Sequence, residues 1–190
     1  MKTITLEELQ TAIKETSNNK AAGPSGLTYE CWKYASKEVH KALQEIFDRI
    51  ISHKKMPSGW KKTNTILIPK PKNWNKNVDI TRPIVLIETA RKIFTKILTN
   101  RIEKACRTNN ILRGNNCSVL RGTSTHVPIN ILTNIIEDAK TEHNKEAWLI
   151  LQDMKKAYDS VRWFGLLKSL RRIKMNEDYI DLLRDLYTTR

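Results

Sequence analysis

The strongest local signal in this chain is the stretch Trp148-Leu149-Ile150-Leu151-Gln152-Asp153-Met154-Lys155-Lys156-Ala157-Tyr158-Asp159-Ser160-Val161. The apolar run from Ala147 to Gln152 favours β structure and predicts a strand. Asp153 follows directly, and a strand end holds a carboxylate rigidly where it can bind a divalent metal. The alternative is that Asp153 ends the strand and caps the next turn.

Two shorter β-favouring runs come earlier in the chain. They are Thr65 to Ile68 and Ile84 to Ile87, and the second follows Arg82-Pro83. Together they predict a short antiparallel hairpin. The connection from Lys70 to Asp79 is rich in Lys and Asn and has no hydrophobic period, so we expect a mobile loop there.

Helical periodicity covers most of the remaining sequence. Thr5 and Glu8 form a capping box, which starts a short amphipathic helix. Longer helices are expected at Tyr29 to Lys54 (whole or broken), Thr89 to Arg107, Pro128 to Thr141, Trp163 to Arg172 and Asn176 to Tyr187. Their predicted buried positions include Val39, Leu43, Ile46, Phe47, Ile50, Ile131, Leu132, Ile135 and Ile136. The element order predicts an α+β fold without a clear domain boundary.

The charge of the chain points to a polyanionic partner. The 190 residues include 34 Lys and Arg against 20 Asp and Glu, a formal net charge of +14. Nucleic acid is the first expectation for such a balance, and a merely soluble basic protein is the alternative.

Cysteine usage and hydropathy constrain the compartment. The three cysteines form no CxxC pair and lie far from any His at metal-ligand spacing, which disfavours a zinc knuckle. The longest apolar stretches are only a few residues, so we expect neither a signal peptide nor a membrane span. These features favour a reducing, intracellular location, the nucleus included.

The pattern from Asp153 to Val161 resembles the first catalytic block of non-LTR (LINE-type, jockey-like) retrotransposon reverse transcriptases. The resemblance implies that Asp153 binds catalytic Mg²⁺ and that Tyr158 stacks under the nucleotide sugar and excludes a ribose 2′-hydroxyl. It implies a supporting role in the turn for Asp159. Two metals suit this chemistry because they stabilise both the attacking and the leaving oxygen.

Three further blocks resemble the same family in order and spacing. Asn19 to Leu27 is similar to an opening block usually written with Gly-Pro-Asp-Gly, but Ser25 stands here in place of Asp. Leu120 to Thr125 is similar to a small Arg-Ser-Thr block. The hairpin block implies that Arg82 and Lys70 approach the triphosphate of the incoming nucleotide, where cations suit phosphate oxygens. The alternative is that both are ordinary surface cations.

The resemblance implies a partial right-hand polymerase fold. Residues 1–145 would be a fingers-like region and residues 146–190 the start of the palm, within one reverse transcriptase domain. The implied partners are an RNA template, a DNA primer and deoxynucleoside triphosphates. Two later blocks of the family, a Gln-Gly type block and a Tyr-x-Asp-Asp turn, do not occur in the 190 residues. We therefore expect no DNA synthesis by these residues alone, and whether they act as an enzyme stays open.

Three interpretations follow. The chain is a piece of a larger RNA-directed DNA polymerase of a mobile element, or a non-catalytic remnant that binds nucleic acid, or an unrelated basic helical protein. The combination of Asp153 and Tyr158 favours the first, because a pure binding module has no chemical need for both.

Overall fold

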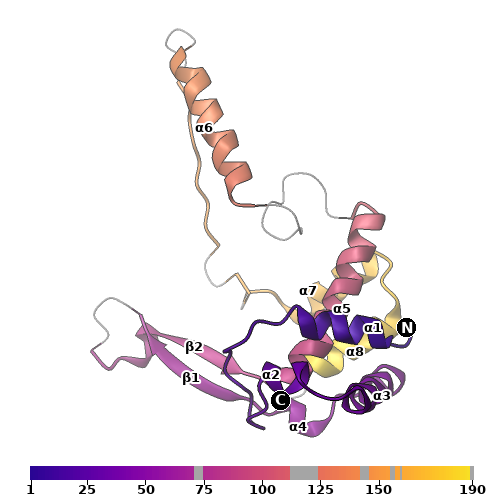
Figure 1. The fold of residues 1–190 in the computed structure, drawn as a ribbon. Coiled ribbons are helices and arrows are strands. Elements are labelled where there is room, and N and C mark those ends of the chain that lie inside the picture. The colour runs from indigo at the N-terminus through magenta and orange to yellow at the C-terminus, as the bar shows by residue number, and fades with distance from the viewer. Residues whose placement is uncertain (71–74, 112–123, 142–145, 155–156, 159, 189–190) are drawn as a thin grey trace. The chain divides into compact units, whose positions relative to one another are not determined.

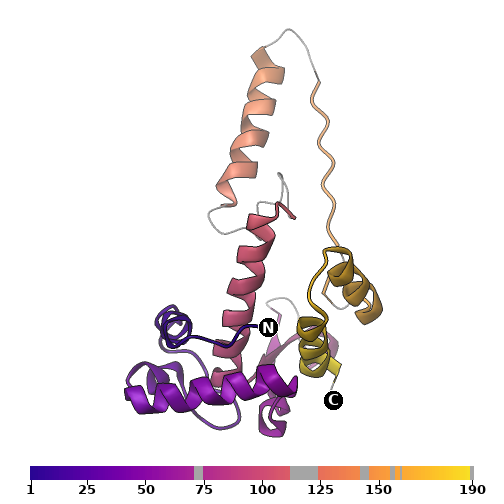
Figure 2. The ribbon, with the colours of Figure 1, turned by 90° about the vertical axis from the view of Figure 1, so that its right-hand side faces the viewer.

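The computed structural model describes residues 1–70, 75–111, 124–141, 146–154, 157–158 and 160–188. These residues form two compact units (Figures 1 and 2), and each is described by itself. Unit 1 comprises residues 1–101 and 170–190, and unit 2 comprises residues 102–169. The elements are α1 (Leu6–Lys14), α2 (Tyr29–Lys33), α3 (Lys37–His53), α4 (Ser58–Lys61), β1 (Asn64–Pro69), the 3-10 helix η1 (Val78–Ile80), β2 (Thr81–Leu86), α5 (Thr89–Thr108), α6 (His126–Thr141), α7 (Trp163–Arg172) and α8 (Glu177–Thr188).

The predicted helix boundaries are largely confirmed. The capping box begins α1, because Thr5 Oγ1 accepts from the Glu8 N–H at 3.1 Å and Glu8 Oε2 accepts from the Thr5 N–H at 3.0 Å. The predicted helix from Tyr29 to Lys54 is broken, since α3 starts anew after Ser36, whose backbone is extended. Asn176 caps α8 by accepting from the Asp178 N–H at 2.8 Å.

The core of unit 1 lies among α1, α3, α5 and α8. Phe47 of α3 occupies its centre, with ring centroids 5.0 Å from Phe94 of α5 and 5.9 Å from Trp60 of α4. Figure 2 shows α3 crossing the N-terminal part of α5, and these two helices carry the neighbouring rings of Phe47 and Phe94. Close packing at this crossing gives unit 1 a fixed base from which the β1–β2 hairpin projects.

The buried face of α3 differs from the predicted one. Val39 and Ile46 are exposed, although both were expected in the core. The buried side chains of α3 are His40, Leu43, Phe47, Ile50 and Ile51. The apolar residues of this helix lie on more than one face. Packing against α1 and α5 buries the face that includes His40. That imidazole is accommodated because its Nε2 lies 2.8 Å from the Trp32 carbonyl oxygen.

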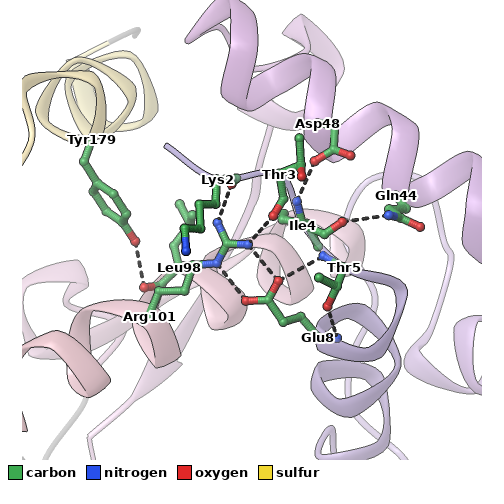
Figure 3. Close-up of polar contacts among 10 residues, drawn as sticks. All are labelled: Lys2, Thr3, Ile4, Thr5, Glu8, Gln44, Asp48, Leu98, Arg101 and Tyr179. Atoms are coloured by element: carbon green, nitrogen blue, oxygen red, sulfur yellow. Dashed lines mark hydrogen bonds and ion pairs between the residues drawn. The ribbon is translucent and has the colours of Figure 1, made fainter.

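Arg101 of α5 joins that helix to α1 and to the segment before α1 (Figure 3). Its Nε and Nη2 donate to the two carboxylate oxygens of Glu8 at 2.8 and 2.7 Å. The same guanidinium donates to the carbonyl oxygens of Lys2 and Thr3 at 2.8 and 2.7 Å. The segment before α1 is therefore fixed through its backbone as well as through Ile4, which is buried.

Asp185 of α8 holds the segment between α3 and β1. Its Oδ2 accepts from the Met56 N–H at 2.8 Å and lies 3.0 Å from Lys61 Nζ, while its Oδ1 lies 3.3 Å from Lys55 Nζ. Asp185 is itself buried. A buried carboxylate is stable here because both oxygens have donors.

Unit 2 departs from two predictions. In α6 no residue is buried, so the expectation that Ile131, Leu132, Ile135 and Ile136 lie in a core is wrong for this chain. The predicted strand from Ala147 to Gln152 is also wrong, since the structure assigns none to residues 146–154. A strand requires a paired neighbour for its backbone groups, and among the described residues only β1 and β2 pair.

The described residues include no helix that is both long and apolar enough to cross a membrane.

Candidate functional site

The hairpin carries the two predicted phosphate-binding cations. β1 and β2 are antiparallel, with Asn64 opposite Leu86 at the base and Pro69 opposite Thr81 near the tip, and the predicted hairpin is thereby confirmed. Arg82 lies opposite Ile68. Pairing continues one residue beyond β1, because the Lys70 N–H donates to the Ile80 carbonyl oxygen at 2.9 Å.

The register places Lys70 and Arg82 at the same end of the hairpin. Side chains alternate between the two faces of a strand, so Lys70 shares a face with Ile68, and Arg82 shares that face as its cross-strand partner. Both cations are exposed, and no ion pair joins either of them to another residue that the structure describes. Two cations on one face form a surface suited to a polyphosphate.

The predicted palm residues lie in unit 2. Asp153 is exposed, and Tyr158 is 97% exposed within a turn. Ser160 Oγ donates to the Ala157 carbonyl oxygen at 3.0 Å, which supports this turn. Asp159 lies outside the described residues. The structure thus brings Lys70 and Arg82 together on the hairpin and describes Asp153 and Tyr158 separately.

The donor set for a metal is incomplete in the described part of the chain. No group of three or more His, Cys, Asp or Glu side chains among those residues could hold a metal ion. Asp153 alone offers two carboxylate oxygens, whereas Mg²⁺ takes six ligands. Asp153 can therefore supply part of a metal site, and the described residues alone do not form one.

The predicted turn at Gly23 to Gly26 is confirmed, and it packs against the start of α5. The Gly26 N–H donates to the Gly23 carbonyl oxygen at 3.1 Å, and Gly26 has a φ of 76°, which favours glycine. The Ser25 N–H and hydroxyl both donate to the carboxylate of Glu88, at 2.8 and 2.5 Å. The segment from Leu120 to Thr125, which is similar to a small Arg-Ser-Thr block, lies largely outside the described residues.

Glu88 is not among the functional residues that the sequence pattern predicts. This carboxylate is only 7% exposed and lies between the end of β2 and the start of α5. The available signal was a charged residue directly after the apolar run from Ile84 to Ile87. Because charged side chains are rarely buried without a partner, that position called for a donor elsewhere in the chain.

The family model for reverse transcriptase (RNA-dependent DNA polymerase) matches residues 68–189, which is more than half of the chain. The chain belongs to the reverse transcriptase family. The match begins within β1 and includes Lys70, Arg82, Asp153 and Tyr158. It also confirms the function class expected from the sequence, a reverse transcriptase domain.

Three relatives place this reverse transcriptase domain among mobile elements. It is 27% identical over 161 residues to the retrovirus-related Pol polyprotein from type-1 retrotransposable element R2 of Nasonia vitripennis, covering 85% of this chain and 15% of that protein. It is 24% identical over 173 residues to a probable RNA-directed DNA polymerase from transposon BS of Drosophila melanogaster, covering 91% and 19%. It is 27% identical over 99 residues to the RNA-directed DNA polymerase from mobile element jockey of Drosophila melanogaster, covering 52% and 11%.

The reverse transcriptase domain thus spans a fifth or less of the length of these relatives. The similarity to R2 and BS extends over nearly the whole chain, including most of the residues before the family match.

Proposed function

We propose that this chain is the fingers and early palm portion of an RNA-directed DNA polymerase of a mobile element. Residues 1–145 are the fingers-like region and residues 146–190 the start of the palm in a partial right-hand fold. The family match over residues 68–189 carries the proposal, because it includes the part of the hairpin with Lys70 and Arg82 and the Asp153 segment. The template is RNA, the primer is DNA, and the substrates are deoxynucleoside triphosphates. The protein works inside the cell, the nucleus included.

Arg82 and Lys70 bind the triphosphate in this proposal. Their shared face of the hairpin and their exposure support the assignment. Arg82 is the more specific contact, because a guanidinium donates two parallel hydrogen bonds to phosphate oxygens and a lysine acts as a point charge.

Asp153 is the proposed ligand for catalytic Mg²⁺, and Tyr158 is the proposed contact to the nucleotide sugar. Exposure of both side chains leaves them accessible to a substrate. Bound Mg²⁺ supplies electrostatic stabilisation of phosphoryl transfer. Asp153 offers only part of the ligand set, and no group of three or more His, Cys, Asp or Glu side chains among the described residues completes it.

Primer extension tests the role of Asp153 in the protein expressed from the full open reading frame. Asp153→Asn should reduce DNA synthesis by at least about a hundredfold while template affinity stays within about twofold. Asp138→Asn, the same change at an exposed position of α6, serves as the control and should leave synthesis unchanged. Strong residual synthesis by Asp153→Asn would reject the metal role.

Steady-state kinetics of the same protein test Arg82. Arg82→Ala should raise the KM for deoxynucleoside triphosphates about tenfold or more, because a charge-assisted contact to phosphate is lost. Arg49→Ala, at an exposed position of α3, is the matched control and should leave this KM unchanged. An unchanged KM in Arg82→Ala would identify Arg82 as an ordinary surface cation.

A second candidate function is nucleic-acid binding without catalysis, and the net charge of +14 favours it. Under this alternative the chain binds RNA with an affinity that falls steeply with salt, because binding releases counterions from phosphates. The affinity would not respond to Mg²⁺ or to deoxynucleoside triphosphates. Fluorescence anisotropy with labelled RNA at several KCl concentrations, with and without both additions, separates the two functions.

A further inference from the structure

Glu88 is a buried carboxylate, and the two groups that donate hydrogen bonds to it are both neutral. It accepts from the Ser25 N–H at 2.8 Å and from the Ser25 hydroxyl at 2.5 Å. No ion pair joins Glu88 to a Lys, Arg or His among the residues that the structure describes. A buried charge without a cation depends on its hydrogen-bond donors, and one residue supplies both of them.

The backbone around Glu88 is in close contact with the same turn. A Cβ atom added to Gly23 would lie 2.6 Å from Glu88 Cα and 2.6 Å from the Glu88 nitrogen. Position 23 of this turn therefore has room for no residue larger than glycine. Ser25 contacts the Glu88 carboxylate through two hydrogen bonds, which we call the lock, and Gly23 contacts the Glu88 backbone.

The next residue strengthens this junction. Thr89 is fully buried, and its Oγ1 accepts from Trp32 Nε1 at 2.8 Å and donates to the Leu27 carbonyl oxygen at 2.9 Å. Glu88 and Thr89 thus receive contacts from three successive parts of residues 23–32. These contacts converge where β2 has just ended, at Leu86, and where α5 begins.

We propose that Glu88 is a positioning residue that fixes the β1–β2 hairpin on α5 by holding the turn from Gly23 to Gly26. Ser25 is the residue that suits this arrangement, because it donates from both its N–H and its hydroxyl. An aspartate at position 25 would place a second carboxylate against Glu88. The serine in place of the family's usual aspartate is therefore matched to Glu88.

The functional consequence rests on the proposed function. Arg82 lies on β2, six residues before Glu88, so the orientation of the hairpin relative to α5 determines where the guanidinium is presented. Glu88 is not itself a proposed contact with nucleotide, and it acts through the hairpin. The lock itself requires no nucleic acid and is testable in the free chain.

A double-mutant cycle in the 190-residue chain tests the lock. Ser25→Asp should lower the folding equilibrium constant about tenfold to a hundredfold, because two carboxylates then lie side by side at a partly buried contact. Combining it with Glu88→Gln should restore the constant to within about fivefold of the native value, since the Gln amide donates to the carboxylate introduced at position 25. Ser17 is exposed like Ser25 but donates no hydrogen bond to Glu88, so Ser17→Asp should change the constant by about twofold or less.

Hydrogen exchange separates positioning from general stability. Ser25→Asp should speed exchange in peptides that cover residues 23–27, 64–66 and 84–89, with no change in α1. The double variant should return these rates to native values. A uniform increase over all of unit 1, or a failure of Glu88→Gln to rescue Ser25→Asp, would overturn the proposal.

The outcome is independent of the polymerase assay. If Ser25→Asp fails to fold, Glu88→Gln and the double variant still decide the matter, because the proposal requires the double variant to fold better than Ser25→Asp. Primer extension that is unaffected by Asp153→Asn and by Arg82→Ala, together with an intact coupling between Ser25 and Glu88, would reject the proposed function and leave the lock standing. Absence of coupling in a protein active in primer extension would do the reverse.

Discussion

Arg101 and Glu8 form a two-pronged ion pair, in which Nε and Nη2 of the guanidinium face the two carboxylate oxygens at 2.8 and 2.7 Å (Figure 3). The remaining donors of Arg101 bind the backbone of Lys2 and Thr3. A single side chain thus joins α5 to α1 and to the segment before it. A lysine has only a point charge and could not make all of these contacts at once.

We expect Arg101→Met to destabilise unit 1 by about 1–3 kcal/mol, because charge-assisted hydrogen bonds are lost and two carbonyl oxygens lose their donors. Urea unfolding followed by circular dichroism measures the change. Arg49→Met removes an exposed arginine of α3 and should alter stability by about 0.5 kcal/mol or less. Equal effects of the two substitutions would mean that the ion pair contributes nothing specific.

The pH dependence of stability should carry a contribution from Glu8. The hydrogen bond from Arg101 lowers the pKa of Glu8 below its ordinary value of 4.5, and partial burial opposes this effect. A carboxyl group with a lowered pKa in the folded state stabilises the protein fully above its ordinary pKa, and this stabilisation is lost as pH falls through the folded pKa.

The test compares the native chain with Glu8→Gln between about pH 6 and pH 3. Other carboxylates also titrate in this window, so the informative quantity is the difference in unfolding free energy between the two proteins. We expect that difference to be largest near pH 6 and to shrink towards pH 3. A difference that is constant with pH would show that ionisation of Glu8 does not matter.

Gly23→Ala should destabilise the chain by about 1–3 kcal/mol, because the new Cβ would lie 2.6 Å from the backbone of Glu88. The matched control is Gly59→Ala in α4, where an added Cβ meets no atom within 4 Å. We expect this control to be neutral or to stabilise by up to about 1 kcal/mol. Thermal unfolding of the two variants tests this prediction. Similar melting temperatures would contradict the close contact between residue 23 and the Glu88 backbone.

Asp185→Asn should cost about 1–3 kcal/mol, because the buried Met56 N–H keeps at best a weaker acceptor and two lysines lose their counter-charge. Burial raises the pKa of Asp185, but the Met56 N–H and the two lysines together outweigh it and lower the pKa. Asp181→Asn breaks a surface pair with Arg184 and should cost about 0.5 kcal/mol or less. Urea midpoints of both variants should therefore separate clearly.

Local sequence signals predicted much of the fold. The capping box at Thr5, the cap at Asn176 and the two β-favouring runs each act over a few residues, and the structure confirms all of them. The placement of Lys70 and Arg82 on one hairpin followed from those runs. Their roles, and those of Asp153 and Tyr158, remain predictions.

Contacts between residues far apart in the sequence escaped prediction. Glu88 bonds to a serine 63 positions away, Arg101 to a glutamate 93 away, and Asp185 to a backbone amide 129 away. No periodicity links such partners. The failed strand from Ala147 to Gln152 has the same cause, because β propensity states a preference while a neighbouring strand decides the outcome.

Trp148 can report on binding to the segment at the start of the proposed palm, which pairs with no strand among the described residues. Its indole is 88% exposed, whereas Trp32, Trp60 and Trp163 are partly buried. In protein labelled with 5-fluorotryptophan, the fluorine resonance of Trp148 should lie near that of the free amino acid and respond to solvent isotope. Any polypeptide or nucleic acid that covers this segment will shift the resonance of Trp148. The spectrum therefore reports whether a binding partner covers the segment.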